Sequence, residues 1–312
     1  MKKLDTINEK TIYLSEELDT VETIKDADDI IEMINLNFLA TTINLSFSKF
    51  GENTKILEKI VNCLIEHDGA TEIILDNCLN EDNNQSVMQI AKLINKKNNL
   101  EYLDLSYNNL QVNDNKCYSL EEAIKKSKSL QTLILECTNL GNAPNLVNAL
   151  AKALKQNKSI EHLDLGSNQL ADLDVSSIKN LADSIAFNNT LENLLLSDNN
   201  IGNDIEKAEL FFNAIKNSKS LKNVNLSYNG IEQADLEIKE IFALSVAECF
   251  AMQKDLTFVI DGDVFNTSDT NSINFMKNEH LIKALIKKLE GEIAVAEANI
   301  SVYLQNPAGI GE

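Results

Sequence analysis

The 312-residue sequence contains no arginine, so its 28 basic residues are all lysines, and 48 acidic residues outnumber them. The formal net charge is -20 at pH 7. Proteins that bind DNA or RNA neutralise phosphates, and arginine is the side chain best suited to reading phosphate and guanine. The same negative charge repels an anionic membrane surface. We therefore expect no nucleic acid and no membrane as a partner, and favour a neutral or basic protein.

Cysteine is scarce and scattered. The sequence contains five cysteines, an odd number: Cys63, Cys78, Cys117, Cys137 and Cys249. None lies in the C-x-x-C spacing that zinc sites and redox motifs use, so neither a disulfide framework nor a zinc site is predicted. We interpret these residues as buried, reduced thiols, which suggests folding in a reducing compartment.

Long apolar segments are missing as well. The first ten residues, MKKLDTINEK, contain lysines, but acidic residues follow where a signal peptide has its apolar region. No run of 18 apolar residues occurs in the sequence. We therefore predict a cytoplasmic fold without a conventional signal peptide and without a membrane span.

The sequence does contain an internal repeat. Residues 100–110 follow the pattern L-x-x-L-x-L-x-x-N-x-L, and the pattern recurs along most of the chain. Taking the third leucine as the reference, its equivalents are 30 residues apart except for one step of 31: Leu45, Leu75, Leu105, Leu135, Leu165, Leu196 and Leu226. Degenerate copies at Leu14 and Ile260 bring the number of candidate strands to nine.

Each repeat is predicted to form a strand, a turn and a helix. Leu103 and Leu105 point to one face of a strand and Asp104 to the other, whereas a helical apolar stripe follows the turn, as in residues 146–154. Neither half buries its apolar face alone, so the repeats must stack. Because strands lie about 4.8 Å apart and helices need about 10 Å, the helices belong on the outside of an arc. The predicted fold is an α/β solenoid with a parallel, concave sheet.

These features resemble leucine-rich-repeat proteins. Residues 140–157, LGNAPNLVNALAKALKQN, look like the helical half of the ribonuclease-inhibitor subtype. The resemblance covers about residues 38–232 strongly and about 10–265 with the degenerate copies. It implies a horseshoe that acts by binding, since the best-known member of this subtype caps enzyme active sites. A ribonuclease as the target does not follow from it.

Three regions are predicted along the chain. Residues 1–37 form an N-terminal capping region with a degenerate first repeat, residues 38–265 form the repeat array, and residues 266–312 form a polar loop and a capping helix. The end of each strand is marked by a further column: Ser48, Cys78, Asn108, Thr138, Asn168, Asn199 and Asn229. An asparagine amide there satisfies backbone groups that the turn leaves unpaired, so Ser48, Cys78 and Thr138 should make their repeats softer.

Catalytic and metal-binding motifs are not recognisable. Neither His67, His162 nor His280 has a metal-ligating partner at helical spacing, and Asp261-Gly262-Asp263 lacks the other ligands of a calcium loop, so we interpret it as a turn. His162 and Asp164 share the outward strand face, but no known motif places a nucleophile with them. We predict a protein that is not an enzyme and has no cofactor. An enzyme with a cryptic site at His162 and Asp164 remains an alternative.

The outward strand face is the predicted binding surface. Although only 5% of residues are aromatic and none is tryptophan, four aromatic side chains project there beside carboxylates and a histidine. The predicted partner-binding residues are these: Phe47, Asp76, Tyr102, Asp104, Tyr107, Glu136, His162, Asp164, Asp198 and Tyr228. The carboxylates would attract a partner that presents lysine or arginine.

These observations favour a monomeric scaffold or inhibitor that binds a partner protein through its concave sheet. The arginine-free composition, rich in lysine, asparagine and isoleucine, suggests an AT-rich genome, and similar repeat proteins are secreted by intracellular bacteria as effectors. Such an effector would act in the host cytoplasm as a virulence protein. The other alternative is a structural protein that self-assembles through its ends.

Overall fold

The computed structural model describes residues 7–8, 10–13, 24–48, 50, 54–79, 83–112, 116–231, 234–235, 237–238, 241–242, 244–245, 248, 255–260 and 263–266. Its strands are β1 (Ile7–Asn8), β2 (Thr11–Tyr13), β3 (Thr42–Asn44), β4 (Glu72–Ile74), β5 (Tyr102–Asp104), β6 (Thr132–Ile134), β7 (His162–Asp164), β8 (Asn193–Leu195), β9 (Asn223–Asn225), β10 (Thr257–Ile260) and β11 (Asp263–Asn266). Its helices are α1 (Ile24–Leu36), α2 (Thr54–Glu66), α3 (Asn83–Lys96), α4 (Cys117–Lys126), α5 (Pro144–Leu154), α6 (Val175–Phe187) and α7 (Ile205–Asn217). Three short 3-10 helices precede the last three helices: η1 (Leu140–Asn142), η2 (Leu170–Asp172) and η3 (Ile201–Asn203).

One sheet of 11 strands runs through the described residues in chain order. Strands β2 to β10 are parallel, and each outward residue lies beside its equivalent in the next repeat, as Ile74, Asp104 and Ile134 do. The nine predicted strands are therefore confirmed, including the two degenerate copies. The antiparallel strands β1 and β11 were not predicted, because they lie outside the repeat pattern. They pair the outermost parallel strands, whose edges would otherwise present unpaired backbone groups.

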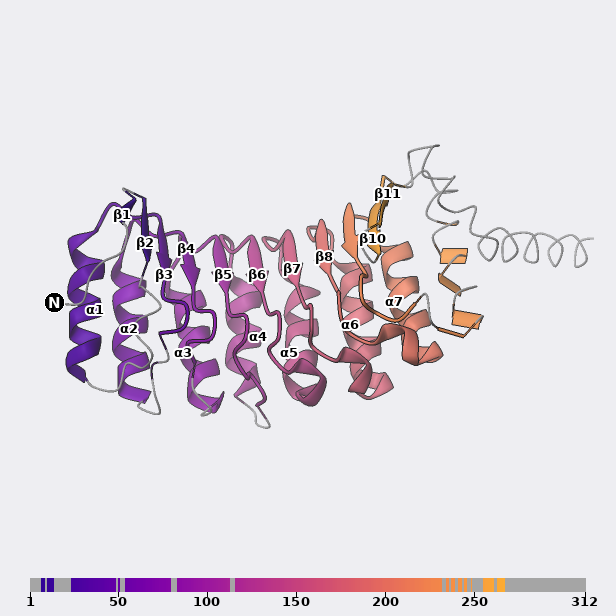
Figure 1. Cartoon of the computed structure of the whole chain (residues 1–312), viewed down its shortest axis with the longest axis horizontal. Helices are drawn as coiled ribbons and strands as arrows, with labels where there is room; N and C mark the ends of the chain where they lie inside the picture. Colours follow the sequence, from indigo (N-terminus) through magenta and orange to yellow (C-terminus); the bar gives the residue numbers. More distant parts are fainter. Residues whose placement is uncertain are drawn as a thin grey trace, which may run out of the picture.

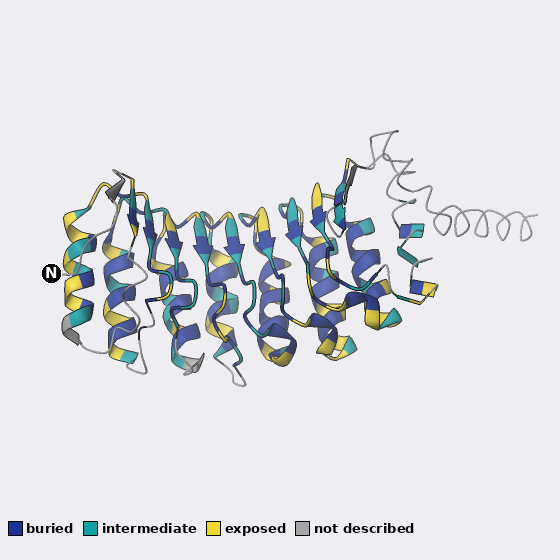
Figure 2. Ribbon diagram, viewed as in Figure 1, coloured by how far each residue is buried: buried dark blue, intermediate teal, exposed yellow. Residues whose placement is uncertain are grey.

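The strands form one row and the helices a second row behind it (Figure 1). The row of strands is bowed, with both ends raised, so the sheet lies on the concave side, as predicted (Figure 1). Between the rows the reference leucines, such as Leu75 and Leu165, are fully buried, and so are Ile60 and Leu64 of α2. Each helix shows a buried side toward the sheet and an exposed side away from it (Figure 2).

The asparagine column satisfies backbone groups at the turns, as predicted, and it also joins consecutive repeats. The buried Asn168 side chain donates through Nδ2 to Leu135 O (2.6 Å) and Gly166 O (2.9 Å). Its Oδ1 accepts from the backbone N–H groups of Thr138 (2.9 Å) and Leu140 (3.2 Å) in the preceding repeat. Equivalent bonds are made by three further asparagines: Asn108, Asn199 and Asn229. A buried amide thus replaces the pairing that the chain loses where it leaves the sheet.

The three replacements in this column satisfy fewer groups. Ser48 Oγ is buried without a hydrogen-bond partner. Thr138 Oγ1 donates to Leu135 O (2.8 Å), but Leu110 N donates to the Thr138 carbonyl oxygen rather than to a side chain. The Cys78 thiol donates to Leu45 O, and burial raises its pKa far above the ordinary value. The expected softness of these repeats remains a prediction.

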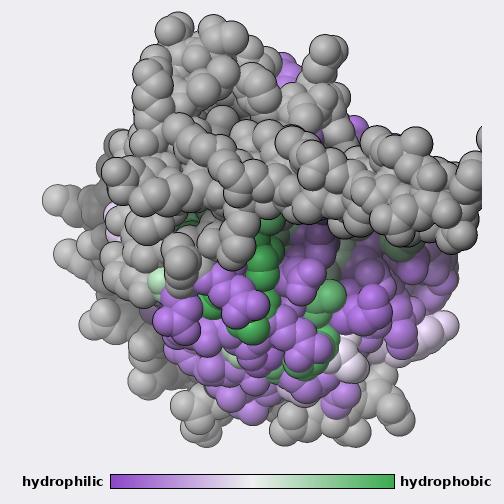
Figure 3. Space-filling model, turned by 90° about the vertical axis from the view of Figure 1, so that its right-hand side faces the viewer, coloured by the Kyte–Doolittle hydropathy of each residue, from purple (hydrophilic) through white to green (hydrophobic). Residues whose placement is uncertain are grey.

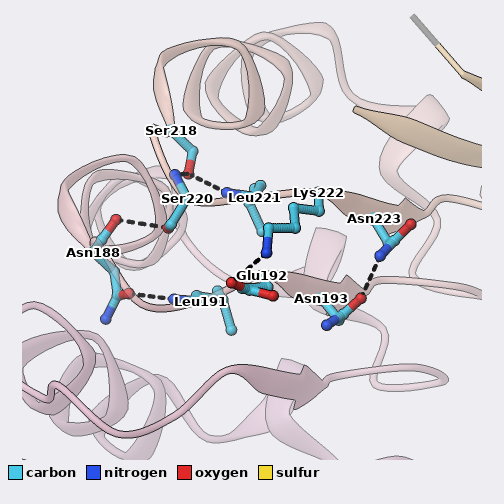
Figure 4. A network of polar contacts seen from close by, with 9 residues as sticks. All are labelled: Asn188, Leu191, Glu192, Asn193, Ser218, Ser220, Leu221, Lys222 and Asn223. Carbon is cyan, nitrogen blue, oxygen red and sulfur yellow. Dashed lines mark hydrogen bonds and ion pairs between the residues drawn. The ribbon is translucent and has the colours of Figure 1, made fainter. Parts of the chain in front are cut away.

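A second polar column lies at the other end of the strands, where each helix ends and the next strand begins. Its members recur at the same spacing as the repeats: Asn37, His67, Lys97, Ser127, Asn157, Asn188 and Ser218. Asn188 shows the pattern: Nδ2 donates to Leu154 O (2.7 Å), and Oδ1 accepts from Thr190 N and Leu191 N (both 2.7 Å). In the next repeat Ser218 Oγ accepts from Leu221 N (3.3 Å; Figure 4).

Three further contacts join the repeat of Asn188 to the repeat of Ser218 (Figure 4). Ser220 Oγ donates to Asn188 O (3.1 Å). Lys222 Nζ lies 2.6 Å from Glu192 Oε1, and Asn223 Nδ2 donates to Asn193 Oδ1 at 2.6 Å. Side-chain hydrogen bonds therefore join consecutive repeats at both ends of the strands.

His67 and Lys97 are the unusual members of the second column. His67 Nδ1 accepts from Ala70 N (3.1 Å), so the neutral ring carries its proton on Nε2, which faces Asn37 O (3.2 Å). Lys97 is only 2% exposed, and its ammonium donates to His67 O (2.6 Å). Burial lowers the pKa of Lys97, although Asp68 opposes the shift. His67 is therefore a structural residue at a helix end.

Several predictions concern residues outside the described ranges. They are the capping helix with His280, Cys249, and the polar loop after its first residue; that residue, Asn266, was predicted in the loop but belongs to β11. Seen from the end of the solenoid beyond α7, the coloured surface is mainly hydrophilic and contains a narrow band of hydrophobic residues (Figure 3). No helix of the described residues is long and apolar enough to cross a membrane.

The asparagine column supports a prediction about stability. Asn168→Ala leaves Thr138 N and Leu140 N without their acceptor, and buried groups left unpaired cost about 1–3 kcal/mol each. We expect the free energy of unfolding in urea to fall by about 3 kcal/mol or more. Asn95→Ala, on the exposed side of α3, is the control and should change it by less than about 0.5 kcal/mol. Equal losses in the two variants would contradict the role assigned to the column.

Candidate functional site

The outward side of the sheet from β3 to β9, with the turn residue pairs that follow the strands, forms one continuous surface, which we call the sheet face. It consists of four rows, each with one residue from every repeat. The first row is Thr42, Glu72, Tyr102, Thr132, His162, Asn193 and Asn223, and the second is Asn44, Ile74, Asp104, Ile134, Asp164, Leu195 and Asn225. The third row is Ser46, Asp76, Ser106, Glu136, Gly166, Ser197 and Ser227, and the fourth is Phe47, Asn77, Tyr107, Cys137, Ser167, Asp198 and Tyr228.

All ten residues singled out from the sequence lie on the sheet face. His162, Asp198 and three aromatic residues are exposed, whereas Tyr102 and four carboxylates are half-buried. The third-row residues Ser106, Gly166 and Ser227 are buried. At Gly166 an added Cβ would lie 3.1 Å from both Asp164 Oδ1 and Ser197 Oγ, so this position has little room for a larger residue.

The carboxylates are close enough to influence one another. Burial, followed by the charges of Asp164, Asp104 and other acids, raises the pKa of Glu136 above its ordinary value. The pKa values of Asp76 and Asp164 are also raised by burial and by the charge of Asp104. Since like charges and partial desolvation both oppose ionisation, the charged form of these carboxyl groups is less stable at the centre of the sheet face than in free solution.

Two of these carboxylates also hold the turn that follows their strand. Asp104 Oδ1 accepts from Ser106 N (2.9 Å) and Ser106 Oγ (2.6 Å), and Asp164 Oδ1 accepts from Gly166 N (2.8 Å). Asn44 and Asn225 make the same bond to the residue two positions later. An amide therefore serves this purpose as well as a carboxylate, and the negative charge at Asp104 and Asp164 is not required by the turn.

Asp76 does not have this arrangement. Its Oδ1 atom is buried without a hydrogen-bond partner, and the residue as a whole is half-buried. A carboxylate oxygen without a donor costs free energy in the folded chain, because water no longer solvates it. Asp76 is therefore a residue that the fold tolerates rather than one that it needs.

The exposed aromatic side chains lie in the fourth row. Phe47 is 47% exposed, Tyr107 is 55% exposed and Tyr228 is 72% exposed. They are in the first, third and seventh repeats of this row, so each lies beside smaller neighbours. The charge of Glu136 contributes most to raising the pKa of Tyr107, whereas burial is the main cause of the raised pKa of Tyr102. Both phenols therefore stay protonated and able to donate a hydrogen bond at neutral pH.

The backbone of the fourth row is left-handed throughout. Its seven residues have φ between 50° and 61°. Among residues other than glycine, Asn and Asp enter this region most readily, and Asn77 and Asp198 follow that preference. Phe47, Tyr107 and Tyr228 contradict it, since a bulky side chain in this region costs about 1–3 kcal/mol. The fold alone gives no reason for aromatic residues at these positions.

The second row alternates between amide or acid and apolar residues across all nine parallel strands: Tyr13, Asn44, Ile74, Asp104, Ile134, Asp164, Leu195, Asn225 and Val259. The half-buried Ile74, Ile134 and Leu195 were not among the predicted site residues. The signal that could have identified them is a period of two repeats, which appears only when equivalent positions are aligned.

The sequence model of the leucine-rich repeat family matches residues 96–113 and 156–179, which fall in the part of the chain that carries β5, β7 and α6. The chain is a leucine-rich-repeat protein. The curated proteins include none that matches it. The family match, the register of the nine parallel strands and the asparagine column agree on the fold.

Solved structures resemble this leucine-rich-repeat protein at low identity. Leiomodin-1 actin-binding site 2 matches with a TM-score of 0.36 and 16% identity, covering 54% of this chain and 92% of that one. The leucine-rich repeat-containing protein LegL7 from Legionella pneumophila matches with a TM-score of 0.46 and 17% identity, covering 88% and 89%. Neither match identifies a partner for this chain.

The alternative enzyme site of this leucine-rich-repeat protein consists of His162 and Asp164, which lie on the sheet face. His162 is exposed at the start of β7, and Asp164 Oδ1 is engaged by the backbone of Gly166. Among the described residues, no group of three or more histidine, cysteine, aspartate or glutamate side chains is arranged to hold a metal ion. Cys137, in the same face, has a pKa raised mainly by burial, which disfavours the reactive thiolate.

The raised pKa values of the face carboxylates predict how stability depends on pH. A carboxyl whose pKa is higher in the folded than in the unfolded chain destabilises the folded chain as the pH rises through the folded value. Asp76→Asn/Glu136→Gln/Asp164→Asn should therefore melt at a higher temperature than wild type at pH 7. The difference should disappear below about pH 4, where ordinary carboxyl groups become protonated. Calorimetry between pH 3.5 and 8 measures it.

Asp174→Asn is the control of opposite sign. Its hydrogen bonds with Ser177 lower the pKa of Asp174, so the charge stabilises the folded chain above the unfolded pKa and this contribution is lost as the pH falls. This variant should melt at a lower temperature than wild type at pH 7. A triple variant that is no more stable than wild type at pH 7 would refute the interpretation that these three carboxylates destabilise the folded chain when they are ionised.

Proposed function

We propose that this leucine-rich-repeat protein is a scaffold or inhibitor that binds a partner protein through the sheet face. One observation carries the proposal: three exposed aromatic residues, Phe47, Tyr107 and Tyr228, occupy left-handed backbone positions where Asn or Asp would cost less. Residues that oppose the local preference of the fold are typical of binding sites. Aromatic side chains surrounded by polar groups are typical of the residues that dominate interface energies.

The charge of the sheet face supports a basic partner. Asp76, Glu136 and Asp164 each have a raised pKa, so an approaching lysine or arginine would relieve repulsion among them. Asp104, at the centre of this group, contributes to all three shifts. A partner cation would therefore gain attraction and remove a cost that the free protein bears.

Replacing the three aromatic residues by asparagine separates binding from folding. Phe47→Asn/Tyr107→Asn/Tyr228→Asn removes the aromatic rings but installs the residue that the left-handed region accepts best, as at Asn77. The variant should melt at the wild-type temperature or above it. It should lose at least tenfold in affinity for a protein captured by the wild type, because such anchors contribute about 2 kcal/mol or more each.

The matched control removes three exposed aromatic residues outside the sheet face. Phe38, Tyr118 and Phe187 are 68%, 63% and 61% exposed. Phe38→Asn/Tyr118→Asn/Phe187→Asn should bind the captured protein as wild type does. Titration of the purified pair by calorimetry measures both affinities. Equal binding by the face variant and wild type would refute the proposal, and loss of binding in the control variant alone would assign the partner to another surface.

Composition adds a proposal about the setting. The arginine-free, lysine-, asparagine- and isoleucine-rich sequence fits an AT-rich bacterial genome, and we propose that the chain is a secreted effector that binds a host protein. A fusion to a calmodulin-dependent adenylate cyclase, expressed in an intracellular bacterium, should raise cyclic AMP in infected cells. The rise should disappear when the secretion apparatus is inactivated. Equal cyclic AMP with and without that apparatus would remove the effector proposal and leave the binding proposal unaffected.

A further inference from the structure

The spacing of the sheet face restricts what backbone a partner segment can have. Neighbouring strands lie about 4.8 Å apart, so the two-repeat alternation of the second row has a period of about 9.6 Å. The row of strands is bowed (Figure 1). On the concave side of a bowed sheet, side-chain ends lie closer together than the backbones that carry them. A segment that crosses the strands in register therefore needs equivalent side chains at about 9.6 Å or slightly less.

Three regular backbones can be compared with that period. An extended strand repeats the same face every two residues, at about 6.7 Å. An α-helix brings residues i and i+7 to one side at about 10.5 Å, so across three periods it runs almost 3 Å ahead of the sheet face. Polyproline II has three residues per turn and rises about 3.1 Å per residue, which gives about 9.3 Å. The polyproline II repeat fits best, and the curvature favours it further over the helix.

The chemistry of the sheet face points to the same backbone. A strand binds by pairing with a sheet edge, and the edges of this sheet are β1 and β11 at its two ends, not the sheet face between β3 and β9. The sheet face instead offers side chains, including Tyr102 and Tyr107. Polyproline II segments dock on aromatic side chains without needing backbone pairing, because they have no internal hydrogen bonds to replace. The aliphatic Ile74, Ile134 and Leu195 suit proline rings placed between basic residues.

We propose that the sheet face binds a polyproline II segment with a lysine or arginine at every third residue. The segment runs across the strands from β4 to β8, its basic side chains reach Asp104 and Asp164, and its apolar residues pack on Ile134 between them. Asp76 and Glu136, also two repeats apart, line the adjoining row. The inference rests on the proposed function, since it specifies the partner segment that the same face receives.

Three labelled peptides of equal charge test the spacing. The first is Lys-Pro-Pro repeated five times, the second has the same composition with its five lysines contiguous, and the third is an alanine-based helix with five lysines along one side. Fluorescence anisotropy at low ionic strength measures their affinities for the full chain. The first peptide should bind at least tenfold more tightly than either of the others.

The residue assignment is tested by Asp104→Asn/Asp164→Asn. Asparagine retains the turn bond, as Asn44 and Asn225 do, so the variant should fold, and the first peptide should bind it at least tenfold more weakly. Glu66→Gln/Glu209→Gln, which removes two charges from exposed helix positions, should bind within twofold of wild type.

The outcomes distinguish this inference from the proposed function. Equal binding of all three peptides indicates charge attraction alone, and tighter binding of the helical peptide indicates a helical partner; either result overturns the polyproline II assignment. Absence of binding by every peptide also overturns it. A captured protein that depends on Phe47, Tyr107 and Tyr228 would still support the proposed function in each case.

Discussion

Neighbouring strands lie about 4.8 Å apart whereas neighbouring helices need about 10 Å, and this mismatch determines the form of the molecule. A stack of strand–helix units must bend toward its strands, as the described chain does (Figure 1). In β3 to β9 the chain leaves the sheet after only three residues. Backbone groups just before and just after these strands would then be unpaired. The columns through Asn168 and Asn188 supply their partners. The two polar columns thus complete the backbone pairing of the curved sheet.

The residues of the sheet face are constrained to different degrees. In the second row, aspartate or asparagine holds the turn in alternate repeats, so only the choice between acid and amide is open at Asp104 and Asp164. In the third row, Gly166 avoids the close contact that a Cβ would make with Asp164 Oδ1 and Ser197 Oγ. The fourth row is constrained by its left-handed backbone alone. Its aromatic residues, and the charges of the second and third rows, are therefore where this protein departs from what a solenoid needs.

The sequence predicted the nine parallel strands, the outer helices and the role of Asn108 and its equivalents, because burial imposes one residue type at each of these positions. The second column was not predicted because its members differ in chemical type. Asn37, His67, Lys97 and Ser127 share only their position in the repeat. Strands β1 and β11 lie outside the repeat, so no periodicity marks them. The left-handed fourth row has no glycine to reveal it, and the burial and mutual repulsion of the carboxylates depend on packing that alignment alone does not give.

The costly residues are not spread evenly over the solenoid. The carboxylates with raised pKa values lie between β4 and β7, and two of the left-handed aromatic residues, Tyr107 and Tyr228, precede Asn108 and Asn229 directly. Each of those asparagines closes several backbone bonds between repeats. The third, Phe47, precedes Ser48, whose hydroxyl is buried without a partner. Strain at Phe47 therefore lacks the local support that Tyr107 and Tyr228 have, so the first repeats of the array should open before the central ones.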